Sequence, residues 1–244
     1  MTSLAGKIAL VVGGGTGIGR AIALAFAAEG SRVVVAGRRE DKLREVVATG
    51  SNPSPIFAHP VDVVDRASVS AMVDWTNLTL GQIDTLVNAA GMNIPDRTMA
   101  DLLPETWDEV LSINATGAYN CIRAVLPQMR SRQAGLIINI SSVAGKRASK
   151  LAGAAYSASK FAMTALGTTV GLEEGKNGIR VTNVYPGETD TLMLDKRPQP
   201  LSREHRARIL QPETVAEMIV AVAKLPPLAH VPELVIKPVW HDYA

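Results

Sequence analysis

A glycine-rich turn between an apolar run and a helical segment constrains the fold of this chain more than any other feature. The run Ile8–Val12 leads into Gly13-Gly14-Gly15-Thr16-Gly17-Ile18-Gly19, and a helical period follows over Ile18–Glu29. Glycines permit a tight turn and close backbone approach, and a helix N-terminus offers unpaired N–H groups to a pyrophosphate. The sequence therefore predicts a dinucleotide-binding loop, with a flexible glycine turn as the alternative. The expected contacts are Gly13, Gly15, Thr16, Gly17, Ile18 and Gly19.

Apolar runs alternate with helical segments along the rest of the chain. Short runs rich in Val and Ile are typical of buried parallel strands, and the segments between them supply the crossovers. We expect strands at Ile8–Val12, Arg32–Ala36, Ile56–Ala58, Ile83–Asn88, Gly135–Ser141, Arg180–Val184 and Glu233–Ile236. We expect helices at Ile18–Glu29, Asp41–Ala48, Arg66–Thr79, Pro104–Arg130, Ala155–Glu174 and Pro212–Lys224. This alternation predicts an α/β fold, a single doubly wound domain over residues 1–244.

Prolines refine this prediction. Pro104 and Pro212 suit the first turns of their helices, whereas Pro127 should kink or end the long fourth helix nearby. Residues 187–210 are rich in proline and charge and have no clear period. Long loops in compact domains are usually lids or binding loops, so we predict a substrate lid there.

Composition narrows the function. A net charge of +2 gives no reason to expect nucleic acid or a membrane as partner. The single cysteine, Cys121, forms no intrachain disulfide and fits a reducing compartment; a packed thiol is expected there. We see neither a signal peptide nor a membrane span, and we expect a cytoplasmic protein without a metal site. The small residues of Ala152–Leu172 indicate close helix packing against another subunit.

The tip of the second strand indicates which dinucleotide binds. A carboxylate about 20 residues past the glycine loop would bind the ribose 2′-hydroxyl of NAD, whereas an arginine accommodates the 2′-phosphate of NADP. Arg38 and Arg39 stand there, at a helix start where the dipole disfavours merely solvated arginines. We predict NADP, with Arg38 as the better-placed clamp. NAD, with Glu40 on the ribose, is the less favoured alternative.

The segment Tyr156-Ser157-Ala158-Ser159-Lys160 is the candidate reactive centre. A tyrosine and a lysine four apart lie on one helix face. The ammonium favours phenolate, so we expect it to lower the Tyr156 pKa from about 10. Tyr156 is therefore a candidate proton donor. An interfacial tyrosine beside a solvated lysine is the alternative.

Several motifs occur in a characteristic order: the glycine loop, Asn88-Ala89-Ala90-Gly91, Asn114, Ser141-Ser142, Tyr156-x-x-x-Lys160 and Pro186-Gly187. Over nearly its whole length the chain resembles the short-chain dehydrogenase/reductase family. The resemblance implies a seven-stranded, mostly parallel Rossmann-type sheet with helices on both faces, in a homodimer or homotetramer. It implies a catalytic set of Asn114, Ser142, Tyr156 and Lys160. It implies cofactor contacts at Asp62, Val63, Asn88, Ala89, Ala90, Gly91, Tyr156, Lys160, Pro186, Gly187, Thr189 and Thr191.

The chain departs from the family pattern in three places. Val12 replaces a threonine, and Ala89 replaces the second asparagine of Asn-Asn-Ala-Gly. Ser142 lies fourteen residues before Tyr156, where thirteen is usual, which leaves open whether Ser141 or Ser142 faces the site. The Ser-x-Ala-Gly setting favours Ser142, with Ser141 bonding to backbone. Asp62, for its part, is either a helix cap or an adenine contact.

The resemblance implies hydride transfer between NADP(H) and a carbonyl or secondary alcohol of a small molecule. Tyr156 would give the proton, Ser142 would bond the carbonyl oxygen, and Asn114 would anchor a water that relays protons to Lys160. The C-terminal run from Gln211 to Ile236 resembles the NADP-dependent 3-hydroxy acid dehydrogenase and carbonyl reductase branch. The substrate does not follow from this resemblance, and a 3-hydroxy acid or a 3-oxoacyl compound is one candidate. A non-catalytic NADP-binding sensor and an NAD-dependent alcohol dehydrogenase are the alternatives.

Basic residues near the predicted site raise the question of substrate charge. They are Lys146, Arg147, Lys150, Lys196, Arg197, Arg203, Arg206 and Arg208. They would meet a carboxylate or phosphate, or they are surface charge diluted by Asp190, Asp195 and Glu204.

Overall fold

The computed structural model describes residues 2–50 and 54–241; Met1 and residues 242–244, the ends of the predicted domain, lie outside the described residues, as do residues 51–53. Each predicted strand forms, with bounds shifted by a few residues. They are β1 (Ile8–Val12), β2 (Arg32–Gly37), β3 (Ile56–Pro60), β4 (Thr85–Asn88), β5 (Gly135–Ile140), β6 (Ile179–Pro186) and β7 (Glu233–Ile236). The sheet has seven strands in the order β3-β2-β1-β4-β5-β6-β7. Every pairing is parallel, which confirms the doubly wound fold and makes the sheet more uniform than expected.

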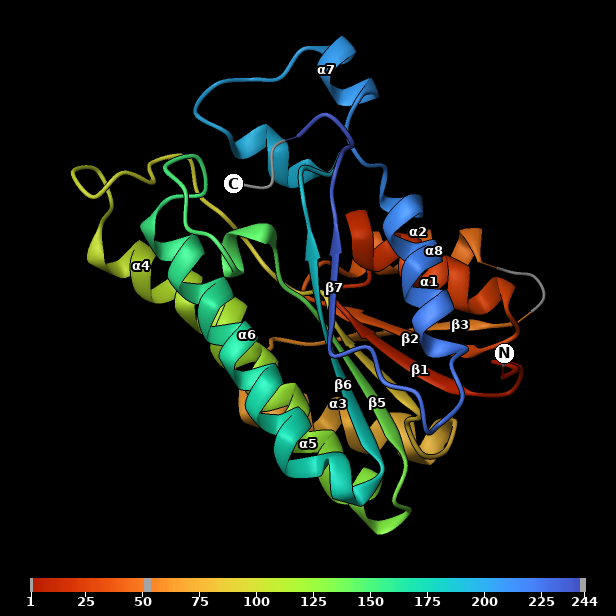
Figure 1. Ribbon diagram of the computed structural model, residues 1–244. Coiled ribbons are helices and arrows are strands. Elements are labelled where there is room, and N and C mark those ends of the chain that lie inside the picture. The colour runs from red at the N-terminus through yellow and green to blue at the C-terminus, as the bar shows by residue number, and fades with distance from the viewer. Residues whose placement is uncertain (1, 51–53, 242–244) are drawn as a thin grey trace.

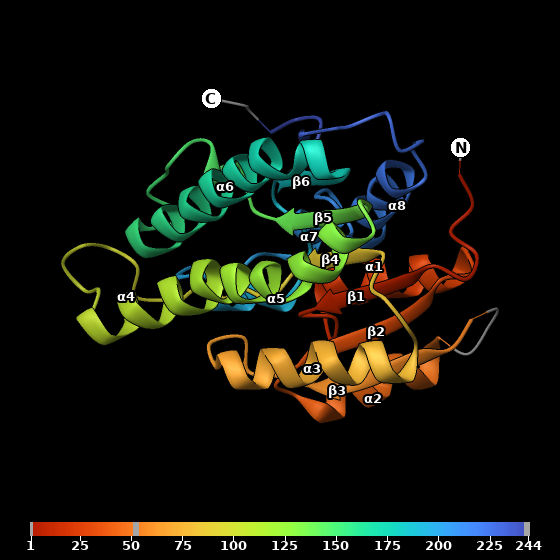
Figure 2. The same cartoon turned by 90° about the horizontal axis from the view of Figure 1, so that it is seen from below.

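Helices cover both faces of the sheet (Figures 1 and 2). One face holds α1 (Gly17–Ala28), α2 (Glu40–Thr49) and α8 (Pro212–Ala223). The other holds α3 (Arg66–Thr79), α5 (Gly117–Ser131) and α6 (Ala154–Glu174). Alternate β1 residues enter opposite cores, since Val11 packs with the first set and Leu10 with the second. Because the strands are buried on both faces of the sheet, their sequences are unbroken apolar runs.

The predicted helix Pro104–Arg130 is divided in two. α4 (Pro104–Leu111) and α5 are joined by a π-helical turn, η1 (Ser112–Thr116). Pro127 lies inside α5, which continues to Ser131, so the proline does not end the helix at its own position. Pro104 and Pro212 do occupy first turns, as predicted.

The 187–210 segment is less irregular than its sequence predicted. It contains a 3-10 turn, η4 (Leu192–Lys196), and a short helix, α7 (Arg203–Ala207). In Figure 1 it rises beyond the carboxyl ends of β6 and β7. Two further 3-10 turns are η2 (Val143–Gly145) and η3 (Gly175–Asn177). Among the described residues, no helix combines the length and apolar character that crossing a bilayer requires.

Strand order places the predicted site residues at one edge. β1 pairs with β2 on one side and with β4 on the other, so the direction of winding reverses there. In open α/β sheets, ligands bind beyond the carboxyl ends of the strands at this switch point. The glycine loop follows β1, and Asn88 ends β4 with Ala89, Ala90 and Gly91 directly after it, so both lie at this point.

Candidate active site

The glycine loop is packed so tightly that side chains are excluded. Gly13 has φ +82°, and a Cβ there would lie 2.4 Å from the Ala90 nitrogen. A Cβ on Gly19 would lie 2.3 Å from the Gly13 carbonyl oxygen, far inside van der Waals contact. Thr16 stands at the N-cap of α1 but makes no side-chain cap bond, so the first N–H groups of α1 are not capped by it. This bare backbone cradle fits an anionic pyrophosphate.

A hollow lies between this loop and the 187–210 segment. Its walls include Gly15, Thr16 and Gly17 on one side and Thr191 on the other. A Cβ on Gly17 would be 3.1 Å from Thr191 Cγ2, so the two segments nearly touch. The fold therefore brings Thr191, a predicted cofactor contact, to the glycine loop. Charged residues of both signs also line this hollow: Arg20, Lys42 and Arg206, and Glu45, Asp190 and Glu213.

The tip of β2 leaves one guanidinium unengaged. Arg39 Nη2 donates to Thr16 Oγ1 at 3.0 Å, which joins the tip to the glycine loop. Arg38 is exposed and makes no hydrogen bond or ion pair with any residue in the described part of the chain. Glu40 accepts from Arg44 Nη1 at 3.2 Å. The tip therefore presents free positive charge, while its carboxylate already has a partner.

The turn after β3 settles one of the alternatives for Asp62. Its Oδ1 accepts from the Val64 nitrogen at 3.0 Å, so it closes a turn. The cap of α3 is Asp65, which accepts from the Ala67 nitrogen at 2.8 Å. Asp62 is therefore no helix cap. Its neighbour Val63 is buried in the same turn.

An asparagine ladder that the sequence reading missed crosses the sheet beneath α6. Asn88 Nδ2 donates to Asn139 Oδ1 at 2.9 Å, and Asn139 Nδ2 donates to Asn183 Oδ1 at 3.1 Å. The three residues are in register on β4, β5 and β6. A Cβ on Gly167 of α6 would lie 2.1 Å from Asn183 Oδ1, so the helix rests directly on the ladder. An asparagine near the end of each of three apolar strands was the available signal.

Asn114 is fully buried in the π-helical turn. Its Oδ1 accepts from the Met92 nitrogen at 2.8 Å, and its Nδ2 donates to the Met92 oxygen and to Ser159 Oγ, both at 2.9 Å. A Cβ on Gly91 would lie 3.4 Å from both Asn114 Oδ1 and Lys160 Nζ. The structure therefore brings three predicted site residues together, Gly91, Asn114 and Lys160.

Lys160 is buried without a carboxylate partner among the described residues. Its Nζ donates to the Ile140 oxygen at 2.8 Å and lies 5.6 Å from the centroid of the Tyr156 ring. Burial lowers the pKa of Lys160 to about 8, because a charged ammonium loses hydration there.

The two serines after β5 have separate roles. Ser141 Oγ donates to the Lys160 oxygen at 3.1 Å, so it bonds to backbone as expected. Ser142 Oγ accepts from the Ala144 nitrogen at 3.1 Å, and the Ser142 hydroxyl acts on the Tyr156 phenol, where it lowers the phenol pKa. Ser142 is therefore the serine that faces the phenol.

The electrostatics of Tyr156 differ from the expectation. Burial raises the pKa of Tyr156 above its usual value, and the hydrogen bond with Ser142 and the charge of Arg97 oppose that rise without cancelling it. The expectation of a lowered pKa was wrong, because lost hydration outweighs these favourable contacts. The phenol consequently holds its proton at neutral pH.

The 187–210 segment is closed at its base by backbone pairing. The Asp190 nitrogen donates to the Leu210 oxygen at 2.8 Å, and the Leu210 nitrogen donates to the Glu188 oxygen at 3.1 Å. Thr189 Oγ1 donates to the Gly187 oxygen at 3.0 Å. These bonds fix residues 187–189, directly after Pro186 at the end of β6, at the carboxyl edge of the sheet.

Much of the positive charge predicted to meet a substrate is paired internally. Arg197 and His205 contact buried Glu188 at 2.6 and 2.9 Å. Lys146 contacts Glu233 at 2.6 Å, and Arg206 contacts both Asp190 and Asp195. The paired cations contribute little net positive charge toward a substrate.

Two further buried side chains are those of Arg97 and Cys121. Arg97, which sequence reasoning did not single out, is buried near Tyr156 and donates only to backbone carbonyls. The Cys121 thiol is buried, and burial raises its pKa to about 12, so it is a packing group as expected. Across residues 2–50 and 54–241 there is no cluster of three His, Cys, Asp or Glu side chains suited to a metal ion.

Comparison with known proteins extends over nearly the whole chain. Residues 7–201 match the family model described as short chain dehydrogenase. The chain is 34% identical over 241 residues to an uncharacterized oxidoreductase of Staphylococcus aureus (strain MRSA252), covering 98% of this chain and 100% of that relative.

Solved structures share the fold. A serine dehydrogenase complexed with NADP+ superposes with a TM-score of 0.87 at 28% identity, covering 98% of this chain and 97% of that one. A 3-ketoacyl-(acyl-carrier-protein) reductase from Brucella melitensis, complexed with NADH, superposes with a TM-score of 0.86 at 26% identity, covering 97% and 99%. Both kinds of nicotinamide dinucleotide therefore occur among proteins of this shape.

Proposed function

The chain belongs to the short chain dehydrogenase family of oxidoreductases, and on that basis we propose that it transfers a hydride between NADP(H) and the carbonyl or secondary alcohol of a small molecule. One observation carries the proposal. Buried Lys160 Nζ lies 5.6 Å from the centroid of the Tyr156 ring, and the Ser142 hydroxyl acts on the same phenol. This group stands at the edge of the sheet where the glycine cradle ends β1.

Each side chain has a chemical task at the reacting oxygen. Tyr156 holds its proton at neutral pH and gives it to the alkoxide that develops during reduction. Ser142 donates a hydrogen bond to that oxygen and stabilises its developing charge. A bound NADPH supplies the hydride, and NADP+ accepts it in the reverse direction. The Lys160 ammonium favours the phenolate that remains after the proton has left.

Asn114 and Lys160 form a route for proton recovery. Asn114 Oδ1 accepts one hydrogen bond, from the Met92 nitrogen, and a carbonyl oxygen has a second lone pair. That lone pair would hold a water beside Lys160 Nζ, since both atoms flank Gly91. With its pKa lowered to about 8, Lys160 exchanges protons near neutral pH more readily than an ordinary lysine.

The cofactor we propose is NADP, held by the residues predicted from the sequence. The glycine cradle and the N-terminus of α1 receive the pyrophosphate, and Thr191 closes over it. Arg38 and Arg39 receive the 2′-phosphate, since Arg38 has no competing partner among the described residues. Glu40 is engaged by Arg44, which weakens the case for an NAD ribose contact. The remaining predicted contacts lie along the same edge.

The substrate we propose is a 3-hydroxy acid or a 3-oxoacyl compound. The serine dehydrogenase and the 3-ketoacyl reductase of similar structure support this class. We propose that the 187–210 segment is the substrate lid, because it is tied at its base and stands over the site. Rates on a matched carboxylic acid and its methyl ester test charge recognition, and equal rates refute it.

We also propose a homodimer or homotetramer. Tyr119 of α5 and Phe161 and Leu172 of α6 expose 40%, 43% and 81% of their surface on the helices of one face. Exposed apolar side chains on adjacent helices are typical of subunit interfaces. Sedimentation would give the subunit count directly.

The decisive experiment is a panel of carbonyls and alcohols assayed with NADP(H) and NAD(H) in parallel. We expect turnover with NADP(H) on 3-oxo or 3-hydroxy compounds and weaker turnover with NAD(H). Tight NADPH binding without oxidation across the whole panel would identify a sensor instead. Faster turnover with NAD(H) would contradict the assignment of Arg38.

A further inference from the structure

Arg97 joins three segments at the substrate side of the site. It lies in the loop between β4 and α4 and is only 7% exposed. Its Nε donates to the Ile94 oxygen at 2.8 Å, Nη1 to the Leu151 oxygen at 2.8 Å, and Nη2 to the Lys196 oxygen at 2.7 Å. These carbonyls belong to its own loop, to the loop before α6 and to the lid.

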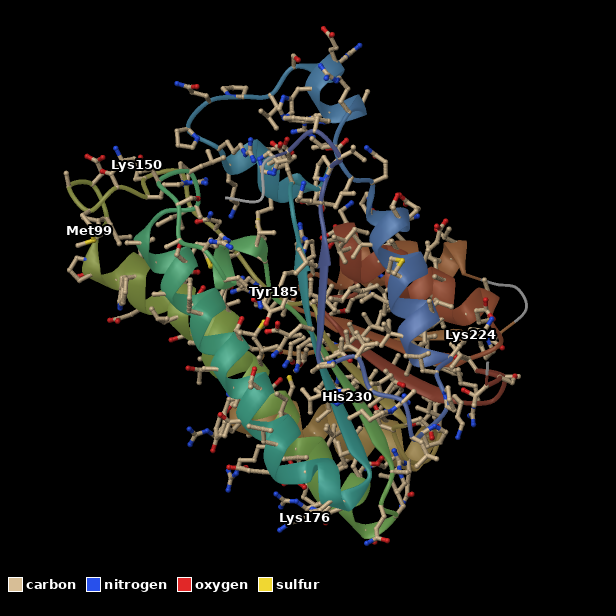
Figure 3. The ribbon with its side chains drawn as sticks, in the orientation of Figure 1. Met99, Lys150, Lys176, Tyr185, Lys224 and His230 are labelled. Atoms are coloured by element: carbon tan, nitrogen blue, oxygen red, sulfur yellow. The ribbon has the colours of Figure 1, made fainter. Side chains whose placement is uncertain are left out.

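The loop before α6 also packs closely against the segment that contains Arg97. A Cβ on Gly153, which has φ +82°, would lie 2.6 Å from Arg97 Cβ. Asn93 Nδ2 donates to the Ala152 oxygen at 3.1 Å. Figure 3 labels Met99 on the first of these loops and Lys150 on the second. Since Tyr156 follows Gly153 by three residues, the placement of Arg97 and of the phenol is coupled.

Arg97 is also an unpaired charge near the phenol. Within residues 2–50 and 54–241 no carboxylate pairs with it, and its positive charge acts on Tyr156. The other charged groups of this region are Lys160 on α6 itself and Arg197 of the lid, whose charge is offset by Glu188. A guanidinium buried without a carboxylate destabilises the fold, so an arginine at position 97 calls for a compensating role.

We propose that Arg97 is a positioning residue that ties the lid to the loop before α6 and fixes a positive charge beside Tyr156. The inference deepens the proposed function, because it assigns what supports the proton donor. When the lid is down, the Lys196 carbonyl holds the guanidinium in place, and the charge then stabilises the phenolate left by proton transfer. Lid position and proton donation are thereby linked through one side chain.

Two substitutions separate the charge from the hydrogen bonds. Arg97→Gln keeps hydrogen-bond donors but removes the charge. Arg97→Lys keeps the charge but loses the planar set of guanidinium donors. Arg180→Met is the matched control, since Arg180 also donates from a guanidinium to backbone carbonyls, those of Leu225, Pro226 and Ala229, away from the site.

The first readout is the pKa of Tyr156 in the full chain. Uniform 3-fluorotyrosine labelling allows fluorine NMR titration, with the Tyr156 signal identified by its loss in Tyr156→Phe. We expect Arg97→Gln to raise this pKa, and Arg97→Lys and Arg180→Met to leave it near that of the unsubstituted protein. An unchanged pKa in Arg97→Gln overturns the electrostatic half of the proposal.

The second readout is amide hydrogen exchange over residues 187–210. Losing a charged hydrogen bond should speed exchange there on the order of tenfold in both Arg97 variants but not in Arg180→Met. Unchanged exchange overturns the tie to the lid. Neither readout needs a substrate, so failure of the activity panel would refute the proposed function without deciding this inference. If the panel succeeds, Arg97→Gln should lower kcat more than it changes KM.

Discussion

The two ends of α6 use charge in opposite ways. At its N-terminal end, Lys160 is buried with its pKa lowered to about 8, and the pKa of Tyr156 is raised by burial. At its C-terminal end, Glu174 is 2% exposed, and Arg130 holds its pKa down at about 2. Lys150 and Lys176, labelled in Figure 3, mark these two ends. One end carries groups in electrostatically costly surroundings, and the other carries a well-paired carboxylate.

The two ends of α6 differ in their effect on the stability of the fold. The buried Lys160 ammonium donates to the Ile140 oxygen and, over a longer distance, to Met163 Sδ. Burial with these neutral partners destabilises the fold but gives a lysine that titrates near neutral pH. Arg130 Nε donates to Glu174 Oε2 at 2.9 Å, Nη2 bonds the other oxygen, and Asn177 adds a bond at 2.8 Å. This anchor fastens α5 to α6 far from the reactive groups. We infer that the far end offsets strain at the site, so changes at the two ends should separate activity from stability.

Tyr156→Phe should give the largest effect. Loss of a general acid lowers kcat on the order of 10²–10⁴-fold, while the free energy of unfolding changes little. Steady-state kinetics on the best substrate of the panel measure the loss, and NADPH binding by fluorescence is the control, since the glycine cradle is intact. Normal turnover in this variant would remove Tyr156 from the reaction.

Glu174→Gln should act on stability and leave the site alone. We expect the free energy of unfolding to fall by about 1–3 kcal/mol. This loss is smaller than for a fully buried ion pair, because Arg130 is half-exposed and solvent screens its charge. Urea unfolding measures the change, and Glu173→Gln, an exposed neighbour on the same helix, is the matched control. A loss of kcat beyond the loss of folded protein would show that the two ends are coupled.

The pH dependence of Glu174 has a definite sign. Its pKa falls from 4.5 to about 2 on folding, so the folded state binds fewer protons between these values. The stability contributed by Glu174 is complete above pH 4.5 and is lost as the pH falls toward 2. Unfolding of the unsubstituted protein and of Glu174→Gln should therefore converge over this range. A constant difference would mean that the carboxylate titrates normally.

Lys160→Met tests the other end of α6, where stability also rises with pH but in an alkaline range. The lysine pKa falls from 10.5 to about 8 on folding, so the unfolded chain binds more protons between these values and stability rises with pH. The free energy of unfolding of the unsubstituted protein should therefore increase relative to Lys160→Met from pH 8 to 10.5. Chemical unfolding at several pH values gives this difference, and a flat difference would contradict a lowered lysine pKa.

The sequence predicted what is local or periodic. Apolar runs gave the seven strands, and spacing put Tyr156 and Lys160 on one face of a helix. It could not predict the Arg130–Glu174 anchor, whose partners are 44 residues apart, or the bond from Arg97 to the Lys196 oxygen, 99 residues away. Such contacts follow from the packing of whole elements. The sign of the Tyr156 pKa shift was missed for the same reason, because burial is a property of the assembled fold.

The π-helical turn around Asn114 was unpredictable for another reason. A π turn has no distinctive sequence period, and its extra residue is stabilised by contacts with other segments. Here Asn114 bonds both backbone groups of Met92, a residue beyond the end of β4. The resemblance to a family indicated that Asn114 belongs to the site. Only the fold shows how the turn orients the side-chain amide of Asn114.

Asn177→Ala should give the smallest effect and the sharpest test of independence between the two ends. Asn177 Nδ2 donates to Glu174 Oε2 at 2.8 Å, so its loss removes one bond while Arg130 keeps the carboxylate paired. We expect the free energy of unfolding to fall by about 0.5–1.5 kcal/mol, with kcat and KM unchanged. Combining it with Glu174→Gln should give less than the sum of the two losses, because both remove the same bond. Strict additivity would show that Asn177 acts through some other contact, whereas a changed kcat would mean that the far end of α6 transmits to Tyr156.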